Sequence, residues 1–483
     1  MPTDHRAGFE TQRAEATARL TVDGDLPTWL RGRYLSNGPG QFEVGGESLE
    51  HWFDPLAMLR GFRFEEGSVR YANRFVRSED FAWARERGRV RTAFPGTPAD
   101  RPPWTRLRQT LTGVFPDNPV IGVRRLDGEF LAVTEAPVGL RFDPDTLETT
   151  GRVDLTDGVD CDLTLAHLHH DPDAGVSWEL GVSYGRGATY TLFRRPDDGG
   201  TPTERTRVRF TDAPYIHSFA LTGRYAVLTV GPFGLDTTTL LRGAFTGETF
   251  LDAFGPLDGS LRFVVLDRET GAHVGTAEAP PAFVYHHANA LETDGELVVD
   301  LVAYPDERAV TGLTLANLRR EDPALPGGDL VRYRVPVPDE ADGDRPTATR
   351  ETLHAGPVEF PTVNYDRVNG REHRYVYLAE TTRPGSSLPT AVAKVDVEGG
   401  VERWSEPDTY PGEPVFVPAP DTAAEDEGVL LSVLLAPDRG RSELLVLDAA
   451  TLTERARAPL PHRLPYGFHG QFYGPHTPGR SVA

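Results

Sequence analysis

The stretch Phe263-Val-Val-Leu-Asp267-Arg-Glu-Thr-Gly271 is an apolar run followed by Asp and by a turn that contains Thr and Gly. Asp and Gly tolerate the backbone angles of tight turns, so the pattern is typical of a β-hairpin. The same degenerate unit occurs at three further places, residues 140–147, 393–400 and 445–451. Each copy predicts a strand, a turn and a second strand. The repeated unit therefore indicates an all-β fold built from hairpins.

The uneven spacing of the four units favours a propeller with insertions. The intervals between their Asp residues differ widely, so the repeat has no fixed period. The chain also contains 49 Gly and 41 Pro residues, which suits many short strands better than long helices. Irregular hairpins along one large domain, residues 1–483, predict a β-propeller with loop insertions. An array of β-sandwiches is the alternative architecture.

Few segments have a helical pattern. We expect short helices at residues 10–20 and 103–111. Residues 240–254 contain apolar side chains at helical spacing, and we expect this segment to be helical and partly exposed.

Charge, cysteine content and hydropathy together narrow the possible partners and the compartment of the chain. With 72 acidic and 50 basic residues the formal charge is −22, so we expect no binding to nucleic acid. The acidic residues are spread along the chain, which is typical of a solvated surface and, more narrowly, of a halophile's cytoplasmic protein. A lone cysteine, Cys161, excludes an intramolecular disulfide. No signal peptide and no apolar run of about 18 residues is found, so we expect a cytoplasmic protein without a spanning helix.

Histidine is the residue type that points to chemistry. Of the 14 histidines, several lie in unusual settings, either clustered, inside apolar runs or between glycines. Four of these settings contain His167, His217, His286 and His469, which lie far apart in the sequence. No local metal motif links them, and any one of them alone is more simply a buried structural histidine. Only a fold that gathers distant strands around an axis could unite them, as a propeller does.

Two N-terminal motifs carry a resemblance to a known family. Residues 36–40 read Ser36-Asn37-Gly38-Pro39-Gly40, and residues 51–54 read His51-Trp52-Phe53-Asp54. Together with the settings of the four histidines, they resemble the carotenoid cleavage oxygenases over nearly the whole chain. The second motif is most similar to the branch of the animal β-carotene oxygenases and the retinal pigment epithelium isomerase. Ser36, Pro55 and Leu168 depart from the family pattern, which has Arg, Gly and Pro there.

The resemblance implies both a fold and a metal site. The implied fold is a seven-bladed β-propeller with a small cap of helices and loops over the metal face. The implied ligands of an iron(II) ion are His167, His217, His286 and His469, with His167 preferred to His169 and His286 to His287. The resemblance also implies that Glu135, Glu359 and Glu413 each orient one imidazole, which leaves His167 to a different partner.

The implied activity is that of a non-haem iron(II) dioxygenase. Such an enzyme uses dioxygen to cleave a conjugated double bond of a carotenoid or apocarotenoid into aldehyde or ketone products, and the conversion of β-carotene to retinal is one example. A stilbene-cleaving oxygenase and a retinyl ester isomerase are alternatives within the family. From a different class, a propeller without catalysis could serve as an interaction module. That alternative predicts scattered histidines and no metal.

A substrate that resides in membranes needs a way into the protein. Because the charge of −22 opposes attraction to anionic headgroups, docking would have to be apolar. Residues 232–254 are the candidate patch for peripheral membrane contact. The alternative is that these side chains pack as core. The apolar residues of the patch are Phe233, Leu235, Leu240, Leu241, Phe245, Phe250, Leu251 and Phe254.

Overall fold

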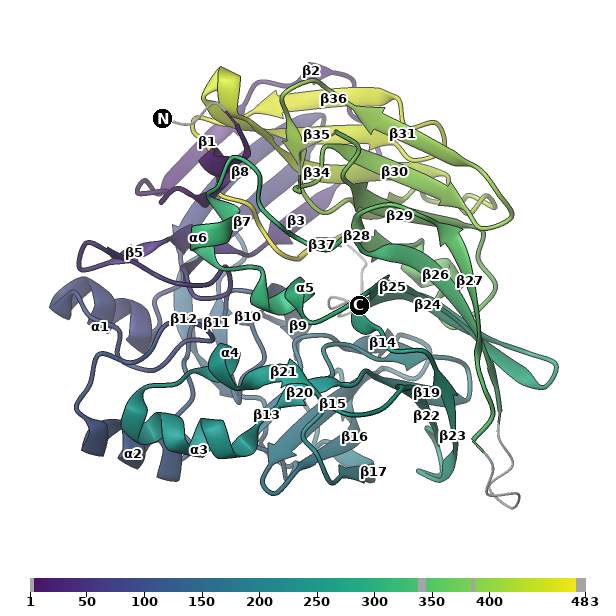
Figure 1. Cartoon of the computed structure of the whole chain (residues 1–483). Coiled ribbons are helices and arrows are strands. Elements are labelled where there is room, and N and C mark those ends of the chain that lie inside the picture. Colours follow the sequence, from purple (N-terminus) through teal and green to yellow (C-terminus); the bar gives the residue numbers. More distant parts are fainter. Residues whose placement is uncertain (1–3, 338–344, 384–386, 475–483) are drawn as a thin grey trace.

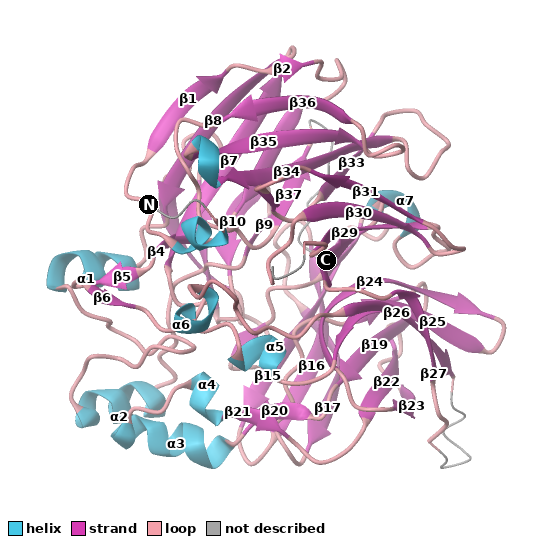
Figure 2. Ribbon diagram, turned by 45° about the horizontal axis from the view of Figure 1, so that its top comes forward, coloured by secondary structure: helices cyan, strands magenta, loops and turns pink. Residues whose placement is uncertain are grey.

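Seven sheets stand around a common axis in the computed structural model, which describes residues 4–337, 345–383 and 387–474 (Figures 1 and 2). Within those ranges each of these sheets has at least four antiparallel strands and forms one blade. The chain is therefore a seven-bladed β-propeller, as predicted, and the array of sandwiches is excluded.

Four blades contain four strands in succession from the axis outward. Blades 4 and 5 carry helical insertions between their second and third strands. The bounds are β9 (Gly122–Leu126), β10 (Glu129–Val133), β11 (Val138–Phe142) and β12 (Thr149–Asp154) in blade 2; β18 (Ala220–Leu221), β19 (Tyr225–Val230), β22 (Leu261–Asp267) and β23 (His273–Ala279) in blade 4; β24 (Phe283–Thr293), β25 (Glu296–Tyr304), β26 (Asp329–Pro336) and β27 (Thr349–His354) in blade 5; and β28 (Val358–Thr362), β29 (Tyr375–Glu380), β30 (Ala391–Asp396) and β31 (Val401–Ser405) in blade 6.

Blade 3 has its innermost strand broken into two short pieces. These pieces both pair with the second strand and flank His167. The strands of blade 3 are β13 (Leu163–Thr164), β14 (His169–Asp171), β15 (Val176–Tyr184), β16 (Ala188–Pro196) and β17 (Thr203–Phe210).

The two ends of the described chain close the ring between blades 7 and 1. The last strand, β37, joins β3 of blade 1, and the early strand β2 joins β36 of blade 7. Blade 1 contains β37 (Gly470–Tyr473), β3 (Gly32–Ser36), β7 (Leu56–Glu65), β8 (Ser68–Phe75) and β1 (Ala16–Leu20), with β4 (Pro39–Gln41) also on β7; blade 7 contains β32 (Tyr410–Pro411), β33 (Val415–Pro418), β34 (Gly428–Ala436), β35 (Arg441–Asp448), β36 (Glu454–Pro459) and β2 (Asp23–Gly24).

The four repeated sequence units occupy one equivalent place in their blades. Each forms the turn between the third and fourth strands from the axis, in blades 2, 4, 6 and 7. In blade 4 the Asp267 carboxylate accepts hydrogen bonds from the backbone N–H groups of Glu269 and Thr270, at 3.1 and 2.9 Å. Asp143, Asp396 and Asp448 make the same kind of turn. The hairpin prediction is confirmed, because the Asp side chain closes each turn.

The helices α1, α2 and α3 lie at the outside of the ring, and α5 lies near its axis (Figure 1). The helix predicted at 103–111 is confirmed, and the segment 240–254 is largely helical as predicted. The helices in the described residues are η1 (His5–Phe9), α1 (Glu79–Arg87), α2 (Pro103–Leu111), α3 (Thr237–Thr246), α4 (Phe250–Ala253), α5 (Arg308–Thr311), α6 (Leu315–Leu318), α7 (Tyr365–Val368) and η3 (Pro437–Arg439); two two-stranded sheets are β5 (Glu43–Val44) with β6 (Glu47–Ser48) and β20 (Phe233–Leu235) with β21 (Phe254–Pro256).

The helix predicted at residues 10–20 is wrong. Residues 16–20 instead form strand β1, the outer edge of blade 1, with Ala16 opposite Asn73 and Leu20 opposite Val69. Its side chains alternate between more and less exposed, which is the pattern of an edge strand rather than of a helix. Pairing with β8 therefore outweighs a weak local helical preference.

Apolar side chains fill the spaces between neighbouring blades and form the core. One cluster joins blades 7, 1 and 2, and another joins blades 3 to 6. None of the helices in the described part of the chain has the length and hydropathy needed to cross a bilayer.

Candidate metal centre

Four histidines from four blades meet at the axis of the propeller. His167 lies between β13 and β14, His217 just before β18, His286 within β24 and His469 just before β37. One ring nitrogen of each lies within 4.8 Å of those of the other three, and all four residues are buried. The structure thus brings together the four histidines that the sequence analysis selected, although no two of them are near each other in the chain.

Three glutamates fix the orientation of three of these rings. His217 Nδ1 donates to Glu135 at 2.6 Å, His286 Nδ1 to Glu359 at 2.7 Å and His469 Nδ1 to Glu413 at 2.8 Å. Because Nδ1 is occupied by a carboxylate, Nε2 is the nitrogen left to bind an ion. The glutamates are the three that the sequence analysis expected, and each one serves a different ring.

The donor set fits a divalent transition metal. The Nε2 atoms of His286 and His469 are 3.1 Å apart. Two nitrogens bound at right angles to one ion, each at about 2.1 Å, would lie about 3.0 Å apart. Burial, followed by the neighbouring rings of His469 and His217, holds the pKa of His286 well below its ordinary value. The ring is therefore neutral, as a ligand must be.

The fourth ring, His167, packs among the other three. Its centroid lies 4.6 Å from that of His217, 4.9 Å from His286 and 4.8 Å from His469. Its neighbour His169 turns away and hydrogen bonds to the carbonyl of Phe219 at 2.8 Å. The break between β13 and β14 thus aims one histidine at the axis and the other outward.

Of the two adjacent histidines on β24, only His286 joins the cluster. His287 hydrogen bonds with the hydroxyls of Ser218 and Thr229, both at 2.8 Å. The register of β24 against β25 shifts on both sides of His287, and the strand is irregular here. Among the histidines judged structural, His5, His51, His273, His354, His373 and His462 lie outside the cluster, and His476 lies outside the described residues.

An unusual backbone turn places Glu359. Phe360, the next residue, has a φ of 55°, in the left-handed region that bulky side chains rarely adopt. Its backbone N–H donates to Glu359, and its ring packs at 5.9 Å from His286 and 5.4 Å from His469. Burial raises the pKa of Glu359 to about 7. This strained residue therefore supports one glutamate and two histidines together.

Backbone hydrogen bonds from the N-terminal motif hold His469 in place. The Asn37 N–H donates to the His469 carbonyl at 3.1 Å, and the Phe468 N–H donates to the Asn37 carbonyl at 3.0 Å. The His469 N–H donates to Ile121 of the neighbouring blade at 3.0 Å. The motif at 36–40 therefore fixes the segment that carries His469, the last histidine of the cluster.

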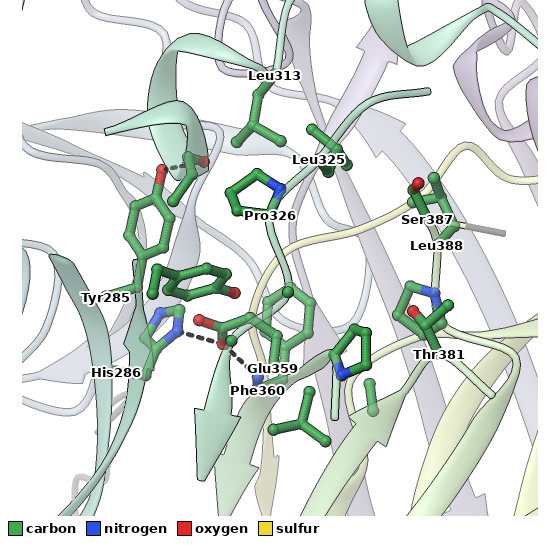
Figure 3. Close-up of a pocket in the computed structure, with 18 of the residues that line it drawn as sticks. Tyr285, His286, Leu313, Leu325, Pro326, Glu359, Phe360, Thr381, Ser387 and Leu388 are labelled. Carbon is green, nitrogen blue, oxygen red and sulfur yellow. Dashed lines mark hydrogen bonds and ion pairs between the residues drawn. The ribbon is translucent and has the colours of Figure 1, made fainter. Parts of the chain in front are cut away.

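A largely apolar pocket opens beside the cluster. The empty space inside it, counted out to the open mouth, is about 890 Å³. Figure 3 shows His286 and Glu359 on one side, with Thr381, Ser387 and Leu388 across from them. The further lining residues include Trp52, Phe53, Ile121, Tyr285, Tyr304, Leu313, Leu325, Pro326, Phe360 and Phe468. The pocket suits an apolar ligand held beside the histidine cluster.

A cap formed by residues 306–328 makes part of the pocket wall, and the motif at 51–54 holds this cap. The Trp52 N–H donates to the Leu313 carbonyl at 3.0 Å, and the Leu315 N–H donates to the Glu50 carbonyl at 2.8 Å. Six cap residues line the pocket and were missed in the sequence analysis: Ala309, Leu313, Leu325, Pro326, Gly327 and Gly328. The end of the cap, residues 322–328, contains Pro and Gly and reads as a loop, but such a sequence does not show what it faces.

The exposed apolar surface is smaller than the patch 232–254. Phe233, Leu235 and Phe254 are buried, while Leu241 and Phe245 on α3 are 65% and 56% exposed. Trp104 on the neighbouring helix α2 is 74% exposed and was not part of the predicted patch. Helices α2 and α3 lie side by side in both views (Figures 1 and 2).

Comparisons with known proteins agree with this geometry. The model of a family described as "Retinal pigment epithelial membrane protein" matches residues 9–474. The chain is 32% identical to a mitochondrial carotenoid-cleaving dioxygenase of Mustela putorius furo, covering 93% of each chain. It is 31% identical to a β,β-carotene 15,15′-dioxygenase of Rattus norvegicus, covering 94% of this chain and 88% of the relative.

Solved structures give the same picture. A variant of the apocarotenoid oxygenase of Synechocystis superposes with a TM-score of 0.84 at 26% identity, over 98% of this chain and 99% of the other. A cobalt-substituted form of that protein gives a TM-score of 0.83 over the same shares.

Proposed function

Because the chain belongs to the carotenoid cleavage oxygenase family, we propose that it is an iron(II) dioxygenase that cleaves a conjugated double bond of a carotenoid or apocarotenoid. The single observation that carries the proposal is the buried group of four histidines, three of which line an apolar pocket. In this proposal His167, His217, His286 and His469 bind the iron, and Glu135, Glu359 and Glu413 orient three of them.

Bound iron would supply the activation of dioxygen, for which imidazole ligands are well suited. The protein's own residues do the remaining work. The glutamates keep the imidazole Nδ1 atoms protonated and the Nε2 atoms directed at the axis. The apolar side chains exclude water and hold the polyene against the cluster, so that one double bond is presented. The products are two aldehydes or ketones.

β-Carotene and apocarotenals are the substrates to test first, and central cleavage of β-carotene would give retinal. The test is incubation of the iron-loaded chain with β-carotene, apocarotenals and a stilbene, with the products identified by mass. Aldehyde products from a carotenoid or apocarotenoid are expected. Cleavage of the stilbene alone would replace the proposed substrate class, and a chain that binds no iron and forms no product would refute the proposal.

We also propose that the enzyme takes its substrate from a membrane surface through α2 and α3. Leu241 and Phe245 are four positions apart on α3 and so share a face, next to the exposed Trp104 of α2. Three large exposed apolar side chains on adjoining helices are the kind of surface that enters an interfacial layer. We further propose that the chain is a cytoplasmic protein of a salt-tolerant cell, because a formal charge of −22 is typical of such proteins.

A further inference from the structure

A buried arginine stands behind the His469 side of the metal centre. Arg60, on β7, is 2% exposed. Its guanidinium donates to the carbonyl oxygens of Pro39 at 2.8 Å and Pro465 at 3.1 Å. In the described part of the chain no carboxylate forms an ion pair with it. Burial lowers the pKa of Arg60 to about 10, so the group remains charged at neutral pH.

The backbone makes room for this guanidinium next to a metal-binding segment. A Cβ added to Gly38 would lie 2.8 Å from Nη1 of Arg60, and one added to Gly467 would be closer still. Gly467 shortly precedes His469 in the chain. Two glycines from opposite ends of the chain thus bring the cation against the segment that carries the last histidine.

The same cation lies near the glutamate that holds His469. Arg60, Tyr34 and Ser36 line a small cavity together with Glu413. Glu413 accepts from His469 Nδ1 at 2.8 Å and from the Gly470 N–H at 2.7 Å. Arg60 and Glu413, the partner of His469, therefore line the same small cavity.

A buried charge without an ion-pair partner is costly, and an apolar side chain of similar size would pack at lower cost. Ser36 offers a clue to why a cation is kept. It stands where the family motif has arginine, and it is the direct cross-strand partner of Arg60. Ser36 and Arg60 stand directly opposite each other on neighbouring strands, so their side chains lie on the same face of blade 1.

We propose that Arg60 is a positioning residue that keeps the metal centre in its divalent state. The inference rests on the proposed function, since it presupposes bound iron. Carboxyl groups accept from three of the histidines, and negative charge there favours the trivalent ion over the divalent one. A fixed cation in a buried site has the opposite effect, because it repels the ion of higher charge more strongly. Arg60 thereby opposes the loss of one electron from iron(II) to an outside oxidant.

The test is a potentiometric titration of the iron-loaded chain with redox mediators, followed by its absorption spectrum. Arg60→Gln keeps a donor for the carbonyl oxygens but removes the charge, and Arg60→Lys keeps the charge. We expect Arg60→Gln to lower the potential, shifting the equilibrium toward iron(III) by roughly tenfold, the order for one unit charge acting through protein. Arg60→Lys is expected to stay close to the parent chain.

The control is Arg124→Gln. Arg124 is equally buried but is paired with Glu179 at 2.7 Å, in the contact between blades 2 and 3. The Arg124→Gln variant is expected to be less stable than the parent chain but to have the same reduction potential. Should Arg60→Gln fail to fold, Ser36→Asp would neutralise the charge of the guanidinium in place and lower the potential. Ser36→Asn, which has the shape of Asp without its charge, would leave the potential unchanged.

Two results would overturn the inference: a potential in Arg60→Gln or Ser36→Asp equal to that of the parent, or an equal fall in Arg60→Lys and Arg60→Gln. The parent chain itself separates this test from that of the proposed function. If the parent binds no iron, the function proposal fails. If the parent binds iron and the reduction potential is the same with and without the charge at Arg60, only the proposed role of Arg60 fails.

Discussion

Nε2 of His51 donates a hydrogen bond of 3.0 Å to the carbonyl oxygen of Val310, on helix α5 of the cap. The other ring nitrogen accepts from the Phe53 N–H at 3.2 Å, so His51 is neutral and fully used. This contact ties the N-terminal motif at 51–54 to a loop that lies far later in the chain. It gives His51 a structural role in holding the pocket wall, apart from the metal.

Replacing His51 by Asn should loosen the cap. We expect faster amide hydrogen exchange in residues 306–328 and little change in exchange of the blade strands, because the lost bond is the one to Val310. Iron content should be unchanged, since His51 lies outside the cluster. Equal exchange in the cap of parent and variant would show that the other backbone bonds suffice.

The same variant should change how stability depends on pH. Burial lowers the pKa of His51 to about 4 from its ordinary value of 6.5, so the unfolded chain takes up this proton first. The stabilisation from neutral His51 is complete above pH 6.5 and is lost as the pH falls toward 4. The difference in unfolding free energy between parent and His51→Asn should therefore narrow by roughly 3 kcal/mol over that range.

Urea unfolding at several pH values measures this difference. Burial raises the pKa of the nearby Asp54 carboxyl to about 6, which acts in the opposite sense, but Asp54 is present in both chains and largely cancels. A difference that stays constant with pH would contradict the assignment of a neutral buried imidazole to His51.

The adjacent residues His286 and His287 should respond in opposite ways to replacement by Ala. His286→Ala removes one nitrogen from the cluster, and we expect iron content to fall far below one ion per chain. His287→Ala should retain iron and lose about 1–3 kcal/mol of stability, because the hydroxyls of Ser218 and Thr229 lose their partner. Metal analysis and thermal unfolding separate the two; iron retained in His286→Ala would remove that residue from the ligand set.

Glu359→Gln should weaken iron binding while a similar change on the same blade does not. The amide cannot hold His286 Nδ1–H as a carboxylate does, and loss of such a partner costs roughly 10- to 100-fold in affinity. Glu380→Gln is the matched control, because Glu380 accepts from His354 at the same distance of 2.7 Å, away from the cluster. Equal iron affinity in both variants would make Glu359 a bystander.

Binding to vesicles should rise with salt and depend on the exposed face of α3. Salt screens the repulsion between the acidic chain and anionic lipid and strengthens apolar burial. We expect Leu241→Asp with Phe245→Asp to lose binding to vesicles of phosphatidylcholine and phosphatidylglycerol. Leu240 is left unchanged because it packs against the core. Thr238→Asp with Thr246→Asp adds the same charge to the same helix as a control. Should both double variants bind alike, the substrate enters elsewhere.

The sequence predicted those parts of the fold that depend on local chemistry. The Asp267 turn and its three equivalents are closed by hydrogen bonds between near neighbours in the chain, so the pattern could be seen directly. Strand β1 was missed because its conformation depends on pairing with β8, which is distant in the sequence. The local preference for helix or strand is weak at such an edge, so pairing with the neighbouring strand determines the conformation.

The candidate site shows the same division. The four histidines could be selected from their settings and the family resemblance, but their meeting depends on the ring of blades. The guanidinium of Arg60 against Gly467 joins the two ends of the chain, and no local pattern marks that contact. The positive φ of Phe360 is likewise imposed by its surroundings and not by its residue type.

The closure of the ring by β37 has a consequence for synthesis on the ribosome. His469 immediately precedes that strand, whereas its partner strand β3 is among the first segments to be made. A nascent chain can form the strand pairs of blades 2 to 7 before β37 is made, yet until then blade 1 lacks its innermost strand and the cluster lacks its fourth imidazole. The innermost strand of blade 1 and the fourth imidazole thus arrive together, and a product that stopped before His469 would have three of the histidines and an open blade.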